Sequence, residues 1–478
     1  MKKINFILLG VFFLLSLNGY SQKTFQPNWE SLDSRQNPAW FADAKFGIFI
    51  HWGLYSVPAW GPTDKEFKSD PGEDWQKKIA VRYAEWYWWR INSPQLKNDF
   101  GYDLFLEHQE KVYGKGSRYE DFVSGFTAQM FDPDQWAELF KNAGAKYVVL
   151  TSKHHEGFAL WPSTQSWNWN AMDVGPHRDL LGDLTNSVKA KGLKMGYYYS
   201  LYEWFNPLFK PETIDRYVDE HMIPQMKDLV TRYKPDVLWG DGQWSYPSAT
   251  WKMPQFMAWL FNESPVKESI VINDRWGNDT WGKHGGYFTV EYGLLADKMV
   301  GSNTISKPWE ECKGIGYSFG YNKNENLEDY ATSEQLVHDL ITKVAAGGNL
   351  LLNIGPTAEG TIPVIMQQRL TDMGTWLKVN GEGIYGTRKW DNAPAITPKT
   401  TVFYTKKDND LYLIVTKWQT NAIVIDGISK AETVNLIGYN SKVKFSVSGN
   451  KLTITPPSVS PADNPCQYAW VFKLKNTL

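Results

Sequence analysis

The chain has 478 residues, which is too long for one small domain, and its 42% hydrophobic and 21% charged residues are typical of a soluble globular protein. This composition excludes a wholly disordered or fibrous chain, and a formal net charge of −2 argues against a nucleic-acid partner. Tryptophan is unusually frequent, with 24 residues. Because indole rings pack against sugars as well as in cores, this count only slightly favours a carbohydrate ligand.

The N-terminus has the pattern of a secretory signal peptide. Two lysines precede an apolar run from Ile7 to Leu17, and small or polar residues follow up to Ser21. The apolar run is too short to span a membrane comfortably as a helix. We therefore expect residues 1–21 to direct export to the periplasm or the exterior, with a retained anchor or a buried helix as the alternative. We expect no stable membrane span in the remaining chain.

Residues 24–390 alternate between short apolar runs and amphipathic segments. The apolar runs are typical of strands buried on both faces of a parallel sheet. The segments 134–144, 335–344 and 367–379 have the pattern of helices. Such alternation fits a barrel or a doubly wound sheet, and we predict a (β/α)8-like barrel because polar residues cluster where the strands end. The predicted strands are Phe46–His51, Tyr147–Lys153, Leu193–Ser200, Asp236–Asp241, Ser269–Asp274 and Asn349–Ile354.

The pattern changes at about Asp391. A proline-containing linker at 392–398 is followed by short alternating strands, which begin near residues 401, 411, 422, 433, 442, 452 and 468 and are separated by turn residues. This pattern is typical of an antiparallel β-sandwich. We therefore predict a catalytic (β/α)8-like domain over 24–390 and a C-terminal β-sandwich over 391–478.

Polar residues follow the predicted strands at their carboxyl ends. His51 ends the first strand, His154 and His155 follow the second, Asp241 ends the fourth, and Arg275 follows the fifth. In a barrel these strand ends meet on one rim. The sequence therefore predicts a polar pocket with aromatic walls, in which Asp241 suits a nucleophile set against a sugar ring. The plainer alternatives are a hydrogen-bonded rim histidine at position 51 and a turn aspartate at position 241.

Other chemistries have weaker support. His154 and His155 point in opposite directions on an extended chain and make a poor metal pair, so we expect no metal. Ser318 lies in a GxSxG pattern, but the single histidine after it leaves too little chain for a hydrolase triad, so a structural role is favoured. Cys312 and Cys466 have no metal or redox spacing, and nothing supports a disulfide between them.

Five segments together carry a family resemblance: Trp40–Gly53, Ala84–Tyr87, Lys153–Phe158, Val271–Gly277 and Gly347–Pro356. In these segments, and over nearly its whole mature length, the chain resembles the α-L-fucosidases of glycoside hydrolase family 29. The resemblance implies a (β/α)8-like catalytic domain followed by a β-sandwich. It also implies hydrolysis of terminal α-L-fucosides with retention of configuration, a fucosylated glycan as the substrate, and no cofactor.

The resemblance also implies roles for individual residues. Asp241 corresponds to the nucleophile, and Glu291 to the acid/base position of bacterial relatives. Glu310 matches a position proposed for animal relatives; we favour Glu291, which follows a strand-like run and should reach the rim. The implied sugar-binding residues are His51, Glu85, Trp86, His154, His155, Tyr199, Trp239, Arg275 and Phe319.

Two details of this assignment stay open. The pattern alone does not separate Tyr199 from its neighbour Tyr198. Phe319 is expected to face the methyl group of fucose, so an α-L-galactosidase would share the other residues but need more room beside Phe319. A non-catalytic fucose-binding protein and a serine hydrolase acting through Ser318 are the remaining alternatives.

Overall fold

The computed structural model describes residues 24–67, 80–93, 101–292 and 307–478. The predicted signal peptide lies outside these residues. None of the helices in the described part has the length and apolar content needed to cross a membrane.

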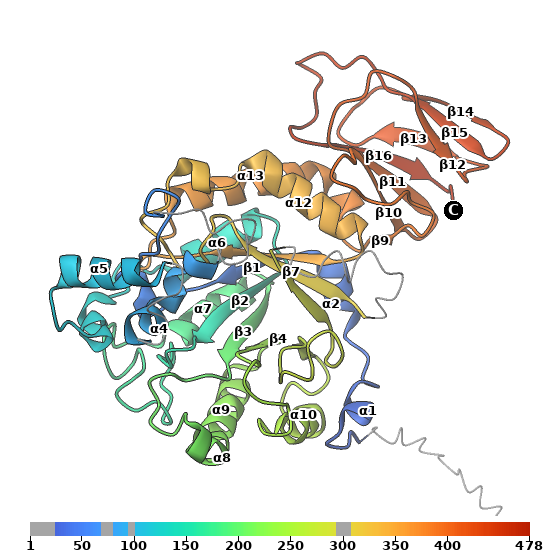
Figure 1. Cartoon of the computed structure of the whole chain (residues 1–478). Helices are drawn as coiled ribbons and strands as arrows, with labels where there is room; N and C mark the ends of the chain where they lie inside the picture. Colours follow the sequence, from blue (N-terminus) through green and yellow to red (C-terminus); the bar gives the residue numbers. More distant parts are fainter. Residues whose placement is uncertain (1–23, 68–79, 94–100, 293–306) are drawn as a thin grey trace, which may run out of the picture.

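Within the described residues, eight parallel strands form one strongly curved sheet, which confirms the (β/α)8-like fold (Figure 1). Their order is β5-β4-β3-β2-β1-β8-β7-β6, so β5 and β6 lie at the two ends of the sheet. The backbone N–H groups of Gly286 and Tyr287 both donate to the carbonyl of Ile272 on β5, at 3.1 and 3.3 Å, and so link the two ends. The strands are β1 (Phe46–Ile50), β2 (Tyr147–Lys153), β3 (Lys194–Ser200), β4 (Val237–Asp241), β5 (Val271–Ile272), β6 (Phe288–Glu291), β7 (Trp309–Gly314) and β8 (Asn349–Ile354).

Helices cover the outside of this sheet, and a large apolar core lies between the two layers. The predicted helix at 134–144 is α6, which Asp132 caps by accepting the N–H groups of Asp134 and Gln135. The α-helices are α1 (Trp29–Leu32), α2 (Ala39–Ala44), α4 (Tyr87–Asn92), α5 (Tyr102–Tyr113), α6 (Pro133–Asn142), α7 (Leu180–Ala190), α8 (Ile214–Arg216), α9 (Ile223–Tyr233), α10 (Met253–Asn262), α12 (Ser333–Ala345) and α13 (Val364–Asn380). Shorter helical turns are η1 (Leu54–Ser56), η2 (Ala84–Trp86), η4 (Tyr119–Gly125), η5 (Pro211–Thr213), η6 (Tyr217–Met222), η7 (Leu327–Asp329) and η8 (Gly381–Gly383).

Strand β7 was not predicted, because three of its six residues are charged. Two of these charged side chains pair with residues of α12, and the third, Glu310, accepts hydrogen bonds from Trp239 and Tyr147 inside the barrel. Glu311 pairs with Lys343 at 2.7 Å, and Lys313 pairs with Asp339 at 2.6 Å. Pairing of this kind lets charged residues occupy a buried strand that a search for apolar runs passes over.

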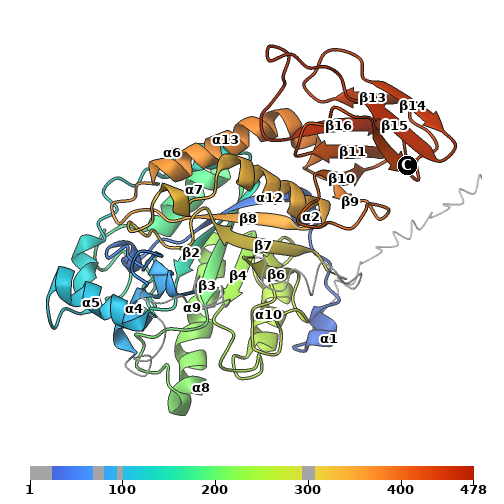
Figure 2. The same cartoon turned by 45° about the horizontal axis from the view of Figure 1, so that its top comes forward.

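The C-terminal residues form two antiparallel sheets, as predicted for a β-sandwich. Helix α12 packs against β8 on one side and against β9 and β10 on the other, so it lies between the two parts of the molecule (Figures 1 and 2). Strand β9 pairs with β10 and precedes the predicted boundary at 391. The strands are β9 (Arg388–Lys389), β10 (Val402–Lys407), β11 (Asp410–Val415), β12 (Ile423–Asp426), β13 (Thr433–Leu436), β14 (Lys444–Ser448), β15 (Lys451–Thr455) and β16 (Trp470–Lys475).

Both cysteines are free thiols. Cys312 lies on β7 inside the barrel and is 1% exposed, whereas the Sγ atom of Cys466 contacts the carbonyl of Ala469 near the start of β16. No disulfide therefore joins the two parts of the chain.

Candidate active site

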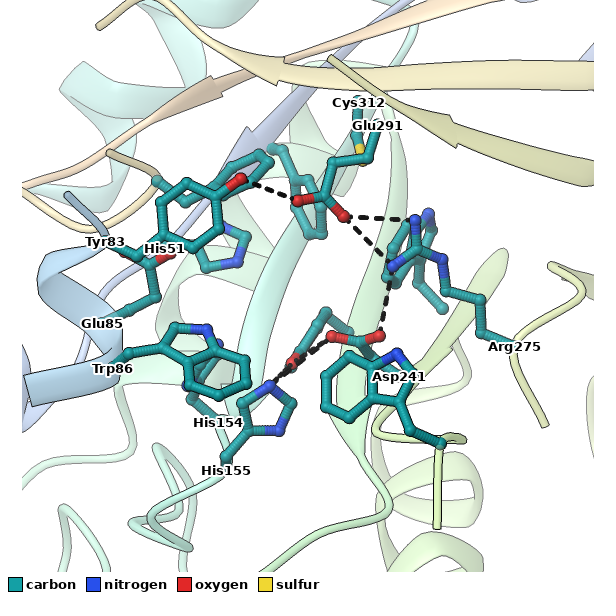
Figure 3. Close-up of a pocket in the computed structure, with 15 residues that line it drawn as sticks. His51, Tyr83, Glu85, Trp86, His154, His155, Asp241, Arg275, Glu291 and Cys312 are labelled. Atoms are coloured by element: carbon teal, nitrogen blue, oxygen red, sulfur yellow. Dashed lines mark hydrogen bonds and ion pairs between the residues drawn. The ribbon is translucent and has the colours of Figure 1, made fainter. Parts of the chain in front are cut away.

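A cavity lies at the carboxyl ends of the barrel strands (Figure 3). This is the rim on which the polar residues were expected to meet. Of the predicted site residues, all except Tyr199 and Glu310 line the cavity. The lining side chains are Phe49, His51, Tyr83, Glu85, Trp86, His154, His155, Tyr198, Trp239, Asp241, Trp244, Arg275, Glu291, Cys312 and Phe319.

Two carboxylates face each other across the Arg275 guanidinium (Figure 3). The Nη1 atom of Arg275 lies 3.2 Å from Oδ1 of Asp241 and 3.3 Å from Oε2 of Glu291. These two oxygens cannot be farther apart than the sum of the two distances. This upper limit on the oxygen–oxygen distance lies at the lower end of the separation found in inverting glycosidases, which is roughly 6.5–9.5 Å. The separation of roughly 5–5.5 Å found in retaining glycosidases lies within the limit.

Arg275 is held firmly in this position. Its Nε donates to Thr289 Oγ1 at 2.9 Å, and that hydroxyl donates to Oδ1 of Asp274 at 2.7 Å. Burial lowers the pKa of Arg275, but the charges of Asp241 and Glu291 outweigh this effect and raise the pKa above its usual value. Arg275 is therefore a fixed positive charge shared by both carboxylates.

Three neutral histidines form another wall of the cavity. Nδ1 of His51 hydrogen-bonds Oδ1 of Asn353 at 2.7 Å, and Nδ1 of His155 hydrogen-bonds Oγ of Ser200 at 2.6 Å. Burial lowers the pKa of all three rings, to about 3 for His154. Neutral imidazoles both donate and accept hydrogen bonds, which suits the hydroxyl groups of a sugar.

Glu85 lines the cavity from η2 and is tied to the loop that carries Phe319. Its Oε2 accepts the N–H of Gly320 at 2.8 Å and the hydroxyl of Ser318 at 3.2 Å. The same hydroxyl oxygen accepts the N–H of Ala84 at 2.9 Å, so Ser318 joins two loops, in keeping with a structural role. Burial raises the pKa of Glu85 to about 7.

Of the two adjacent tyrosines that the sequence pattern did not separate, Tyr198 lines the cavity and Tyr199 does not. The Tyr198 hydroxyl donates to Oδ2 of Asp241 at 2.9 Å. The Tyr199 hydroxyl donates instead to Oε1 of Gln225 on α9, at 2.8 Å, among the helices outside the sheet. Successive strand residues point to opposite faces, and the register aligns Tyr198 with Trp239. That register is the signal that separates the two tyrosines.

Glu310 does not line the cavity and is completely buried. Its Oε1 accepts the indole N–H of Trp239 at 3.0 Å, and its Oε2 accepts the hydroxyl of Tyr147. Burial raises the pKa of Glu310 to about 7. Of the two acid/base candidates, only Glu291 is therefore in contact with the cavity.

Four lining residues are absent from the predicted set: Tyr83, Trp244, Cys312 and Phe49, which lies on β1 within the Trp40–Gly53 segment. Tyr83 donates from its hydroxyl to Oε1 of Glu291 at 3.0 Å, and it directly precedes the Ala84–Tyr87 motif. Trp244 is 40% exposed at the cavity rim and lies three residues after Asp241. Cys312 is two positions after Glu310 on β7 and faces the barrel interior. Proximity to the Ala84–Tyr87 segment would have indicated Tyr83, and proximity to Asp241 would have indicated Trp244. Strand alternation, counted from Glu310, would have indicated Cys312.

Comparison with known proteins identifies the scaffold. A family model described as α-L-fucosidase matches residues 13–382, and a model of the α-L-fucosidase C-terminal domain matches residues 396–475. An α-L-fucosidase of Dictyostelium discoideum is 41% identical over 487 residues, covering 98% of this chain and 99% of that protein. The tissue α-L-fucosidase of Bos taurus is 40% identical over 461 residues, covering 94% of this chain and 91% of that protein.

Solved structures agree with this result. An α-fucosidase of Thermotoga maritima is 37% identical with a TM-score of 0.75, covering 94% of this chain and 100% of that chain. The same enzyme in complex with fucose is 36% identical with the same TM-score, again covering 94% of this chain and 100% of that chain. The barrel, the sandwich and these matches over almost the whole length show that this chain belongs to the α-L-fucosidase family of glycoside hydrolases.

Proposed function

We propose that this chain is a retaining exo-α-L-fucosidase that removes terminal α-L-fucosyl residues from glycans without a cofactor. Asp241 is the nucleophile, and Glu291 is the acid and base. The observation that carries the proposal is the contact of both carboxylates with one nitrogen of Arg275, which keeps them close enough for double displacement.

In the first step, the Asp241 carboxylate attacks the anomeric carbon and forms a fucosyl ester. The bond to the leaving oxygen breaks, and that oxygen takes the proton of Glu291. Arg275 and the Tyr198 hydroxyl, both bonded to Asp241, orient the attacking carboxylate. In the second step, Glu291 takes a proton from water, whose oxygen attacks the same carbon and releases Asp241. Two inversions give net retention.

Recognition of the methyl group of fucose is assigned to an apolar corner. Phe319 packs against His51, Tyr83 and Tyr292, with ring centroids 4.9, 5.5 and 5.3 Å away. A hydroxymethyl group pressed against this corner would lose hydrogen bonds to water. The enzyme is therefore expected to prefer α-L-fucosides to α-L-galactosides.

Turnover of an aryl α-L-fucoside, followed by proton NMR, tests the proposed function. The first sugar released should be α-L-fucose, before it equilibrates with the β anomer. The matched aryl α-L-galactoside should react roughly 10- to 100-fold more slowly, the effect of about 1–3 kcal/mol for a poorly solvated hydroxyl. Release of β-L-fucose would overturn retention, and faster galactoside turnover would overturn the substrate assignment. Binding of fucose without turnover of the fucoside would show instead that the chain is a non-catalytic fucose-binding protein.

The two adjacent tyrosines provide a matched pair of variants. Tyr198→Phe removes a hydrogen bond to a carboxylate, so kcat/KM should fall roughly 10- to 100-fold. Tyr199→Phe should leave kcat/KM within about twofold and cost about 1–3 kcal/mol of unfolding free energy, because Oε1 of Gln225 loses its donor. Kinetics and urea unfolding of both variants check this. The reverse pattern would restore the original assignment.

Export is part of the proposal. It rests on the residues 1–21 and their signal-peptide pattern. Mass spectrometry of the protein recovered from the periplasm or medium of a producing bacterium should show a chain that begins near residue 22. A full-length chain retained in the cytoplasm would contradict export.

A further inference from the structure

Two buried polar atoms beside the cavity face each other without hydrogen-bond partners in the described residues. They are Nδ1 of His154 and Oε2 of Glu156, which lie 3.7 Å apart. His154 is 4% exposed and lines the cavity, whereas Glu156 is 1% exposed and does not. A buried polar atom without a partner is unfavourable. The 3.7 Å separation is longer than a hydrogen bond, and a small side-chain rotation would bring the two atoms within hydrogen-bonding distance of each other.

The backbone holds the two side chains in this arrangement. The N–H of Gly157 donates to the carbonyl of His154 at 3.1 Å, which closes a turn around Glu156. The indole N–H of Trp169 donates to the carbonyl of Glu156 at 3.1 Å. Gly157 has φ +88°, and a Cβ there would come within 2.3 Å of Glu203. The approach of the two side chains therefore follows from a turn that only glycine permits.

The surroundings favour uncharged forms of both groups. Burial raises the pKa of Glu156 to about 8, and burial lowers the pKa of His154 to about 3. Lys153 is the nearest cation to Glu156 along the chain, and its ammonium group forms an ion pair with Oε2 of Glu203 at 2.9 Å. At pH 7 Glu156 is thus a carboxylic acid with a proton to donate, and His154 is an imidazole with one nitrogen able to accept it.

We propose that Glu156 is a positioning residue: its carboxyl group donates a hydrogen bond to Nδ1 of His154 and so keeps the imidazole proton on Nε2. The ring is also held by Tyr198, on which it stacks with a centroid distance of 5.4 Å and an interplanar angle of 10°. Nε2–H then serves as a donor to a sugar hydroxyl in the cavity. This inference rests on the proposed function, in which His154 binds the fucosyl residue.

The position of the proton on His154 is measured directly by 15N NMR of histidine-labelled protein at pH 7, without substrate. The His154 signals are assigned by their loss in His154→Phe. The expected result is a protonated Nε2 and an unprotonated Nδ1. Glu156→Gln should keep this tautomer, because the amide N–H donates in the same direction. A proton on Nδ1 in the wild-type protein would overturn the proposal.

A double-mutant cycle shows whether Glu156 acts through His154. Glu156→Leu should lower kcat/KM for an aryl α-L-fucoside about tenfold, and Glu156→Gln should keep kcat/KM within about threefold of wild type. In the His154→Phe background, Glu156→Leu should change kcat/KM less than about twofold. Equal losses in both backgrounds would overturn the positioning role.

The outcomes separate this inference from the proposed function. A wild-type protein with the expected His154 tautomer but no turnover of the fucoside would reject the proposed function alone. Turnover by the wild type with no difference between Glu156→Leu and Glu156→Gln would reject the role of Glu156 alone. If Glu156→Leu does not fold, the His154 tautomer measured by 15N NMR in the wild type and in Glu156→Gln still tests the role of Glu156.

Discussion

Replacing Asp241 by alanine is expected to abolish hydrolysis, with a loss in kcat of about 10⁴-fold or more. Without the carboxylate no fucosyl ester forms, and water has no activated route to the anomeric carbon. Asp241→Asn should lose as much, because an amide keeps the shape but is not a nucleophile. Steady-state kinetics with an aryl α-L-fucoside measure the loss, and thermal unfolding verifies that both variants fold.

Added azide distinguishes a variant that has lost only its nucleophile from a variant whose whole active site is disrupted. In Asp241→Ala, azide should enter the space left by the carboxylate and attack from the same face. The product is then β-L-fucosyl azide, with configuration opposite to that of the substrate. Retention of more than about a hundredth of the wild-type rate by both variants, without azide, would show that Asp241 is not the nucleophile.

Replacing Glu291 by alanine should give a loss that depends on the leaving group. For fucosides with poor leaving groups, kcat/KM should fall about 10²–10⁴-fold, the usual contribution of general acid catalysis. Aryl fucosides whose phenolate leaves without a proton should lose much less in kcat/KM. Their fucosyl ester should still accumulate, because the water that hydrolyses it has lost its base. Azide needs no base, so it should restore turnover and give α-L-fucosyl azide.

Glu310→Gln is the matched control for this experiment. Glutamine keeps an oxygen that accepts the indole N–H of Trp239, and its NH2 group can donate to the hydroxyl oxygen of Tyr147. We expect kcat/KM within about tenfold of wild type, no dependence on the leaving group and no rescue by azide. If Glu310→Gln and Glu310→Ala show the dependence instead, and Glu291→Ala does not, the acid/base assignment moves to Glu310.

Much of the fold was predictable from local patterns. Apolar runs such as 147–153 and 349–354 are strands with the predicted bounds, because residues buried on both faces of a sheet must be apolar almost without interruption. The seven alternating strands after residue 400 were found for a similar reason, since one face of each strand covers a core. Strand β7 was not predicted because the partners of its charged residues are not its neighbours in sequence. Glu311 and Lys313 pair with α12, and Glu310 accepts hydrogen bonds from Trp239 and Tyr147.

The residues of the site were predictable as a set but not in every detail. His51, Asp241 and Arg275 stand at or just beyond strand ends, and parallel strands in a barrel bring those ends to one rim whatever lies between them. Tyr83 has no such signal, because it reaches Glu291 from a loop.

The sequence by itself indicated the barrel, the sandwich and the strand-end residues of the site, because periodicity and strand-end chemistry are local properties of the chain. The family resemblance implied the other candidates, among them Glu85, Trp86 and Phe319. Only the tertiary structure decided between Tyr198 and Tyr199 and between Glu291 and Glu310 as cavity residues. The first choice depends on which face of β3 is turned inward, which the register with β4 sets. The second choice depends on depth in the barrel. Glu310 accepts the indole N–H of Trp239 and is buried below the cavity, while Glu291 reaches the rim beside Arg275. Burial and register arise between segments far apart in sequence, so no local pattern records them.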